Sequence, residues 1–258
     1  MYRNLVLSCL ASERYVSSLP FYFFLGVFAP AVHAQSISSI GSANVSKGSL
    51  AVEARTGYAL DNDQISGSQD ERFRTRLHAD YGVTDSYAAR IILKGDKRKN
   101  SHFEHDSMEF ENRFELFSSD TYGFDGGVRF TYALKDGDKK PDTITMRLVE
   151  VIPLDNWEIR FNQFFSHEVG EDSEGGLLFE SRMQATYAVS NKFRAGLDSF
   201  NNFGKLNDLS GYSAQAHTAG PVLKYGLSNG YGIETGYLAG LSTNAADHTF
   251  RLFLSKKF

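Results

Sequence analysis

The arginines and the apolar residues of this chain fall on opposite phases of a two-residue alternation. In the stretch 71–82 every second position from 72 to 76 is an arginine, and phenylalanine, leucine and tyrosine lie on the phase between. A helix would scatter these arginines around its axis, whereas a strand places all of them on one face and the apolar residues on the other. The pattern therefore predicts strands with one charged face and one apolar face.

The same alternation recurs from residue 49 to the end of the chain, in segments of about ten residues, the length that a tilted strand needs to cross a bilayer. About twelve such segments are present, an even number, as closed bacterial barrels require. They span 49–60, 71–82, 87–96, 107–118, 122–134, 142–152, 156–167, 177–189, 192–203, 216–227, 230–241 and 248–258. Gly220 and Pro221 interrupt the tenth segment, and because proline has no N–H to give to a ladder, they predict a bulge or a late strand start.

The connections between the segments alternate between short and long. The short ones are rich in turn formers and span 83–86, 118–121, 153–156, 190–192 and 227–230. Longer polar stretches lie between them. Membrane-spanning barrels have short turns at one end and long loops at the other. Because the number of segments is even, both ends of the strand array are expected on the short-turn side.

If the apolar faces lie against lipid, the opposite phase faces the inside of the barrel. That phase carries Arg55, Arg72, Arg74, Arg76, Arg90, Arg113, Arg129, Arg147, Arg160, Arg182, Arg194 and Arg251, together with Glu109, Glu111 and Glu115. Guanidinium groups stay charged and match the planar shape of carboxylate or phosphate. The hypothesis is that these residues line a pore for passive diffusion of small, preferably anionic solutes.

Two alternatives remain open at this stage. A soluble sandwich would turn the charged faces outward and the apolar faces into a core, and alternation alone does not separate it from a barrel. The arginines at 72, 74 and 76 could also pair across the interior with the glutamates at 109, 111 and 115. Such ion pairs would fill the barrel, and the protein would then be a non-conducting barrel that anchors or sheathes a partner protein.

The first 34 residues differ from the rest. Arg3 and Arg14 precede an apolar run that ends in Val32 and Ala34, the small residues that a signal peptidase prefers, so 1–34 is predicted to be a signal peptide. The stretch 35–48 is predicted to be a flexible N-terminal segment, and 49–258 the barrel. The single cysteine, Cys9, lies in the leader, so no disulfide is expected after it.

No catalytic, metal or cofactor site is predicted. Ser166 and His167 are neighbours and therefore lie on opposite faces of a strand, where they cannot act as nucleophile and base. His102, Glu104 and His105 lie in a predicted loop and are interpreted as solvated side chains. The formal net charge of -4 gives no argument for nucleic-acid binding. The chain is not expected to be an enzyme.

The last residues, HTFRLFLSKKF, alternate and end on Phe258, and they resemble the carboxy-terminal insertion signal of outer-membrane barrels. Lys256 departs from that pattern, which usually has an apolar residue there. Leader, strands and Phe258 together resemble the bacterial outer-membrane β-barrel (porin-like) superfamily over 49–258. More narrowly, 219–254 resembles part of a poorly characterised set of proteobacterial outer-membrane proteins.

This resemblance implies a closed antiparallel transmembrane β-barrel, located in the outer membrane of a Gram-negative bacterium after export. It implies outer-membrane lipid and the barrel-assembly machinery as partners. About twelve strands and arginine-rich walls are also similar to small porins for acidic oligosaccharides, a similarity of architecture alone.

Overall fold

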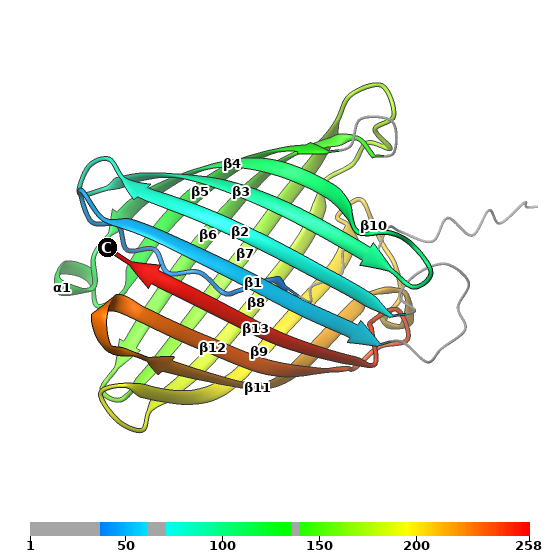
Figure 1. The fold of residues 1–258 in the computed structure, drawn as a ribbon. Coiled ribbons are helices and arrows are strands. Elements are labelled where there is room, and N and C mark those ends of the chain that lie inside the picture. Colours follow the sequence, from blue (N-terminus) through cyan, green and yellow to red (C-terminus); the bar gives the residue numbers. More distant parts are fainter. Residues whose placement is uncertain (1–36, 61–70, 136–139) are drawn as a thin grey trace, which may run out of the picture.

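The computed structural model describes residues 37–60, 71–135 and 140–258. These residues form one antiparallel sheet of thirteen strands, and twelve of them close into a barrel (Figure 1). The predicted all-β closed barrel of about twelve strands is therefore confirmed. The predicted signal peptide, 1–34, lies outside the described residues.

Every predicted segment corresponds to one strand of the barrel. The strands are β1 (Leu50–Leu60), β2 (Arg72–Gly82), β3 (Tyr87–Arg98), β4 (Glu104–Phe117), β5 (Asp125–Lys135), β6 (Asp142–Leu154), β7 (Trp157–Val169), β8 (Leu178–Ala188), β9 (Phe193–Lys205), β11 (Ala216–Gly226), β12 (Tyr231–Gly240) and β13 (His248–Lys257). Each pairs with the next, and β1 pairs with β13 to close the sheet. The additional strand, β10 (Asp208–Leu209), pairs with β9.

The outer face of the barrel is apolar. Exposed side chains on it include Phe73, Leu77, Tyr81, Ile91, Phe110, Phe114, Phe130, Tyr132, Leu148, Trp157, Phe250, Leu252 and Leu254. A closed sheet leaves no unpaired edge, so this surface can face hydrocarbon without unsatisfied backbone groups. The soluble sandwich is therefore wrong, because the apolar faces lie outside and not in a core. No helix in the described residues is long and apolar enough to span a membrane.

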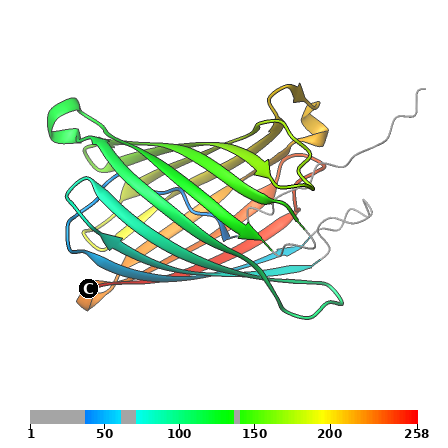
Figure 2. The same cartoon turned by 90° about the horizontal axis from the view of Figure 1, so that it is seen from above.

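The two ends of the barrel differ in the length of their connections (Figures 1 and 2). The start of β1 and the end of β13 lie at the short-turn end, on the left of Figure 1, and the long connections lie at the opposite, long-loop end. Between β6 and β7 the turn has only two residues, and its Asp155 adopts φ 50°, a left-handed conformation that aspartate tolerates.

Two strand starts differ from the prediction by three residues: β4 begins earlier, at Glu104 and not at 107, and β5 begins later. Strand β5 begins at Asp125 and not at 122, because Ser119–Tyr122 form a single helical turn, α1, in the connection from β4. Gly123 ends this turn with φ 79°, and the N–H of Ser119 donates a hydrogen bond to Oδ1 of Asp125 at 2.6 Å. The left-handed glycine and the aspartate together fix where the strand resumes.

The bulge or late start expected at Gly220 and Pro221 is wrong. Strand β11 begins at Ala216 and runs through both residues, with an unbroken register against β9. Its ladder to β12 omits the pairs at these two residues but resumes at Val222 in the same register. The missing proline N–H therefore leaves a local gap in one ladder, and the strand neither bulges nor shifts.

The chain preceding β1 lies inside the barrel. In Figures 1 and 2 the blue segment before β1 runs through the interior from the short-turn end. We call Ile37–Val45 the strap. It belongs to the stretch 35–48, for which flexibility stays a prediction, and Ile37, Ile40 and Ala43 of the strap are buried. The barrel interior is therefore occupied by wall side chains and by this segment.

Candidate functional site: the inner wall

The strand register places basic side chains directly beside one another on the inner wall. Across β1, β2 and β3, Arg55 is opposite Arg76, and Arg76 is opposite Lys94; we call these three the β1–β3 row. Across β4, β5 and β6, Arg113 is opposite Arg129, which is opposite Arg147; these form the β4–β6 row. Like charges opposite one another destabilise a sheet, so each row needs compensating partners.

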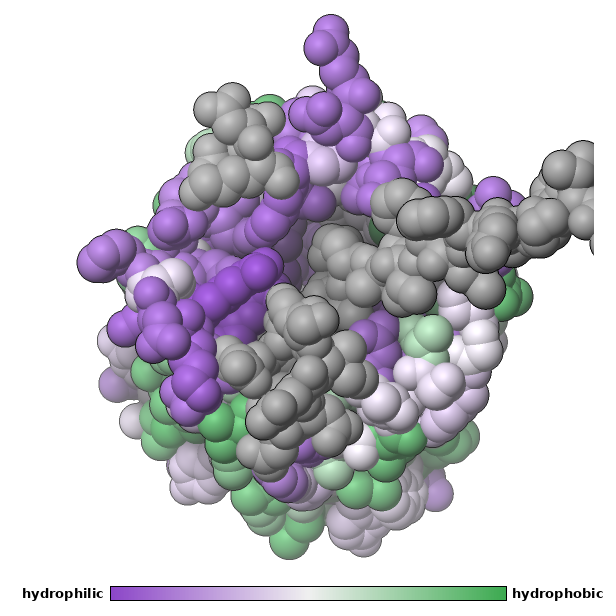
Figure 3. Space-filling model, turned by 90° about the vertical axis from the view of Figure 1, so that its right-hand side faces the viewer, coloured by the Kyte–Doolittle hydropathy of each residue, from purple (hydrophilic) through white to green (hydrophobic). Residues whose placement is uncertain are grey.

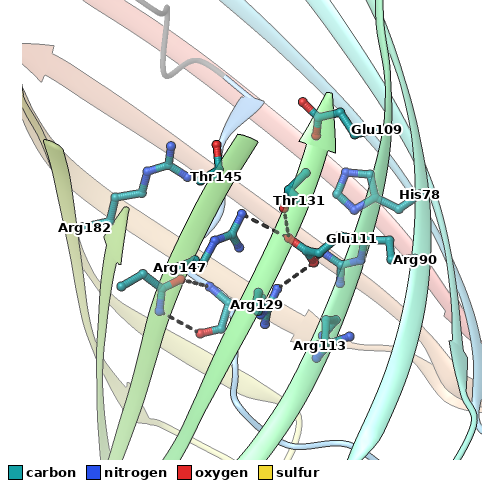
Figure 4. A network of polar contacts seen from close by, with 12 residues as sticks. His78, Arg90, Glu109, Glu111, Arg113, Arg129, Thr131, Thr145, Arg147 and Arg182 are labelled. Atoms are coloured by element: carbon teal, nitrogen blue, oxygen red, sulfur yellow. Dashed lines mark hydrogen bonds and ion pairs between the residues drawn. The ribbon is translucent and has the colours of Figure 1, made fainter. Parts of the chain in front are cut away.

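Glu111 is the centre of compensation for the β4–β6 row (Figure 4). Its carboxylate forms ion pairs with Arg90 and Arg129, both at 3.2 Å, and with Arg147 at 3.3 Å. The Thr131 hydroxyl donates to the same carboxylate at 3.3 Å. The Glu111 side chain is 0% exposed, so its charge is desolvated and depends on these partners.

A second carboxylate extends this network toward β2. Asp80 accepts hydrogen bonds from Arg90 at 2.6 Å and from Arg113 at 2.8 Å. Arg90, Arg113, Arg129 and Arg147 thus share Asp80 and Glu111. Four positive charges stand against two negative charges, so this network carries an excess of two positive charges.

The β1–β3 row contains one cation without an ion pair among the described residues. Arg55 pairs with Glu53 and Lys94 pairs with Glu109. Arg76, between them, has no ion pair within the described part of the chain, and its buried Nε has no hydrogen-bond partner there. A cation without a carboxylate in this position adds to the positive bias of the wall.

Arginines and phenylalanines alternate along a large part of the inner circumference. The contacts join guanidinium carbon to ring centroid: Arg147–Phe164 at 4.3 Å, Arg182–Phe164 at 3.8 Å, Arg182–Phe200 at 5.8 Å, Arg251–Phe200 at 5.0 Å, Arg251–Phe253 at 5.6 Å and Arg55–Phe253 at 4.9 Å. We call this series the Arg–Phe belt. Stacking on aromatic faces favours a cation and restricts its rotamers, so the belt fixes four of the predicted arginines.

The other predicted residues have local partners. Arg72 and Arg74 pair with Asp96 of β3 at 2.6 and 3.4 Å. Arg160 pairs with Glu158 at 2.7 Å and Arg182 with Glu180 at 2.8 Å. Arg194 donates to the hydroxyl and the carbonyl of Thr186, both at 3.1 Å.

The ion pairs considered between β2 and β4 are wrong in detail. Strand β3 lies between them and supplies its own charges: Asp96 pairs with Arg72 and Arg74 of β2, and Lys94 pairs with Glu109 of β4. Glu115 instead accepts a hydrogen bond from the N–H of Val45 in the strap, at 2.6 Å. The role of the arginines as pore-lining residues stays a prediction.

Sequence reasoning missed the apolar and aromatic part of the inner wall. Phe164, Phe200 and Phe253 share the phase of the arginines on their own strands, so the alternation did contain the signal. It also missed His78, which is buried beside the β1–β3 row and has no hydrogen-bond partner at either ring nitrogen in the described structure. No group of three or more His, Cys, Asp and Glu residues that could hold a metal occurs among the described residues.

The long-loop end of the barrel is hollowed at its centre (Figure 3). Hydrophilic residues surround the part of this hollow that is visible, and apolar residues lie along the outer rim of the molecule.

Solved structures share this architecture. The COG4313 outer membrane channel from Pseudomonas putida F1 superposes with a TM-score of 0.62 at 9% identity, over 85% of this chain and 99% of that chain. The fold is that of bacterial outer-membrane porins and channels. The NanC porin (TM-score 0.58, 12% identity, 80% of this chain and 100% of that chain) and the KdgM porin (0.58, 9%, 81% and 99%) have the same porin fold.

Sequence comparison does not assign the chain to a particular protein family. No protein-family model matches the chain, and no curated protein matches it. The resemblance of 219–254 to a particular set of proteobacterial proteins stays a prediction.

Proposed function

We propose that this porin-fold protein is a channel in the outer membrane of a Gram-negative bacterium, and that small anionic solutes diffuse through it. On this proposal the short-turn end faces the periplasm and the long loops face outward. The solved structures of the same fold are described as porins or channels, which supports the channel part of the proposal.

The excess of arginine over carboxylate on the inner wall carries the anion preference. Glu111 and Asp80 are shared among four arginines, and Arg76 has no ion pair in the described part of the chain. In a narrow, low-dielectric surround, uncompensated cations raise the local concentration of anions and repel cations. Fixed guanidinium groups suit this role because they keep their charge at every physiological pH.

The experiment is single-channel recording of the purified protein in a planar bilayer under a salt gradient. The sign of the reversal potential gives the preferred ion, and we expect anion selectivity. The variant Arg76→Gln removes an interior charge and is expected to reduce that selectivity. Steady openings with cation selectivity would contradict the proposal.

The matched control is Arg98→Gln. Arg98 carries the same charge at the long-loop end of β3, and its side chain is 53% exposed, so bulk salt screens it. The reversal potential of this variant is expected to stay close to that of the unmodified protein. An equal loss of selectivity in both variants would mean that net charge, and not the position of Arg76, determines the effect.

A non-conducting barrel that anchors or sheathes a partner protein is the second candidate. The observation that favours it is the strap, which lies in the interior with buried side chains. If protein that is shown to be inserted in the bilayer gives no channel openings, and a partner protein co-purifies with it, this second function would be supported over the channel.

A further inference from the structure

The strap is bound to the inner wall through its backbone. Arginines donate hydrogen bonds to the carbonyl oxygens of alternate strap residues: Arg251 to Ser38 at 2.9 Å, Arg160 to Ile40 at 3.2 Å, Arg129 to Ser42, and Arg113 to Asn44 at 3.3 Å. These arginines come from β13, β7, β5 and β4, so wall positions far apart in the sequence converge on one extended segment.

One wall residue binds the strap as a neighbouring strand would. The Asn162 side chain accepts from the N–H of Gly41 at 2.8 Å and donates to the carbonyl of Gly41 at 3.2 Å. A Cβ on residue 41 would lie 2.5 Å from Nη2 of Arg129, so the glycine allows the wall to approach the backbone this closely. Asn162 itself is completely buried.

The apolar side chains of the strap meet the apolar part of the wall. Ile40 is 2% exposed and forms a buried cluster with Phe200 of β9 and Leu238 of β12. Phe200 is also a member of the Arg–Phe belt. Burial of an isoleucine side chain stabilises the bound strap, so this contact anchors it in one register.

These contacts depend on backbone groups and on a few side chains, as in the binding of an extended peptide along a strand. We infer that the inner wall is a binding site for an extended peptide, that the strap is its built-in ligand, and that the bound strap obstructs the channel. The obstruction rests on the proposed channel function, whereas the peptide site does not. Four of the predicted pore-lining arginines, at 113, 129, 160 and 251, form this site.

The first test measures peptide binding without reference to conduction. The full chain with Ile37–Val45 deleted is prepared in detergent, and a fluorescent synthetic peptide with the sequence ISSIGSANV is titrated into it. Saturable binding is expected, and a peptide with aspartate at the Ile40 position should bind at least about tenfold more weakly, because it loses the apolar contact. Equal binding of both peptides, or no binding, overturns the peptide site.

A pair of wall variants in the deletion background locates the site. Asn162→Ala removes both bonds to Gly41 and is expected to weaken peptide binding about tenfold. Gln163→Ala is the matched control, because Gln163 is the next residue of β7 and its exposed side chain lies on the other face of the strand. Equal effects of the two substitutions would place the peptide elsewhere and contradict the assignment.

Conductance then tests the obstruction. Deletion of the strap is expected to raise the single-channel conductance, and the added peptide to lower it again. In the full-length chain Ile40→Asp should also raise it, while Lys47→Gln, which changes the net charge equally at an exposed position, should not. If deletion leaves the conductance unchanged, the proposed obstruction is wrong, whereas the proposed channel function is not contradicted.

The failure of the two proposals is distinguishable. If neither the full chain nor the deletion variant conducts after demonstrated insertion, the channel function fails, and the fluorescence titration alone decides the peptide site. If the deletion variant does not fold, Ile40→Asp in the full-length chain keeps the obstruction testable: a conductance equal to that of Lys47→Gln would refute it.

Discussion

Neutralising Glu111 tests whether one carboxylate holds the β4–β6 row together. The substitution Glu111→Gln keeps the size of the side chain and removes its charge. Arg90 keeps its second partner, Asp80. Among the described residues, Arg129 and Arg147 form ion pairs only with Glu111, at 3.2 and 3.3 Å. The variant therefore leaves two desolvated guanidinium groups without a carboxylate.

Removing one partner of a buried ion pair destabilises a protein by about 3–5 kcal/mol. We expect Glu111→Gln to lower the free energy of unfolding by about that amount, since the Glu111 side chain is fully buried. The assay is urea unfolding of the barrel in lipid vesicles, followed by tryptophan fluorescence. Trp157 is the single tryptophan of the chain and lies exposed on the outer face, so its emission reports loss of the lipid-embedded barrel.

The control is Glu174→Gln. Glu174 pairs with Lys205 at 3.2 Å, but the two side chains are 66% and 31% exposed, so solvent screens the pair and the expected loss is about 1 kcal/mol or less. Equal midpoints for the two variants would refute the central role of Glu111. Selectivity provides a second readout with the opposite sign: the positive excess of the network rises from two to three, so Glu111→Gln should be less stable but more anion-selective.

Three further predictions concern other parts of the molecule. Phe164→Leu removes the ring that Arg147 and Arg182 both contact and should lower the free energy of unfolding by about 1–3 kcal/mol, measured by urea unfolding; an unchanged midpoint would contradict the importance of the Arg–Phe belt. Gly82→Ala places a Cβ 1.9 Å from the carbonyl oxygen of Ser46. It should therefore displace the residues that follow the strap and increase tryptic cleavage after Lys47. Cleavage equal to that of the unmodified protein would argue against this close approach. Phe258→Ser should lower the amount of protein assembled in the outer membrane of expressing cells, and normal assembly would refute the predicted insertion signal.

The barrel was predictable because a closed sheet with two different faces imposes its pattern on the sequence. Strand residues lie alternately on an apolar outer face and a polar inner face, so the sequence alternates along every strand. The two-residue turn at Asp155 and the alternation of short and long connections follow from the same geometry. Lys256, which departs from the insertion pattern, donates to the carbonyl of Asn229 and lies 4.1 Å from the ring centroid of Tyr231, contacts available at the short-turn end of the barrel.

The partners of the charged side chains were not predictable, because they depend on register. A shift of one strand by two residues keeps every side chain on its face but changes every neighbour. The sequence places Arg76 and Glu109 on the inner phase, yet only the pairing of β2 with β3 brings Lys94 between them. The strap escaped prediction for a different reason, since 35–48 contains mostly small and polar residues, which are also typical of flexible segments.

The two basic rows differ in their contacts with the strap, a difference that neither the alternation nor the composition of the sequence predicts. In the β4–β6 row, Arg113 and Arg129 each donate to a carboxylate and to a strap carbonyl, so the strap helps to satisfy guanidinium groups that two carboxylates cannot satisfy alone. In the β1–β3 row, none of the strap contacts described above is made, and Arg76 lacks an ion pair within the described residues. Release of the strap would therefore free guanidinium N–H donors in the β4–β6 row without altering the β1–β3 row. For this reason strap deletion should increase anion selectivity through the arginines that donate to the strap, Arg113 and Arg129 of the β4–β6 row together with Arg160 and Arg251. Arg76→Gln should reduce selectivity whether the strap is present or absent.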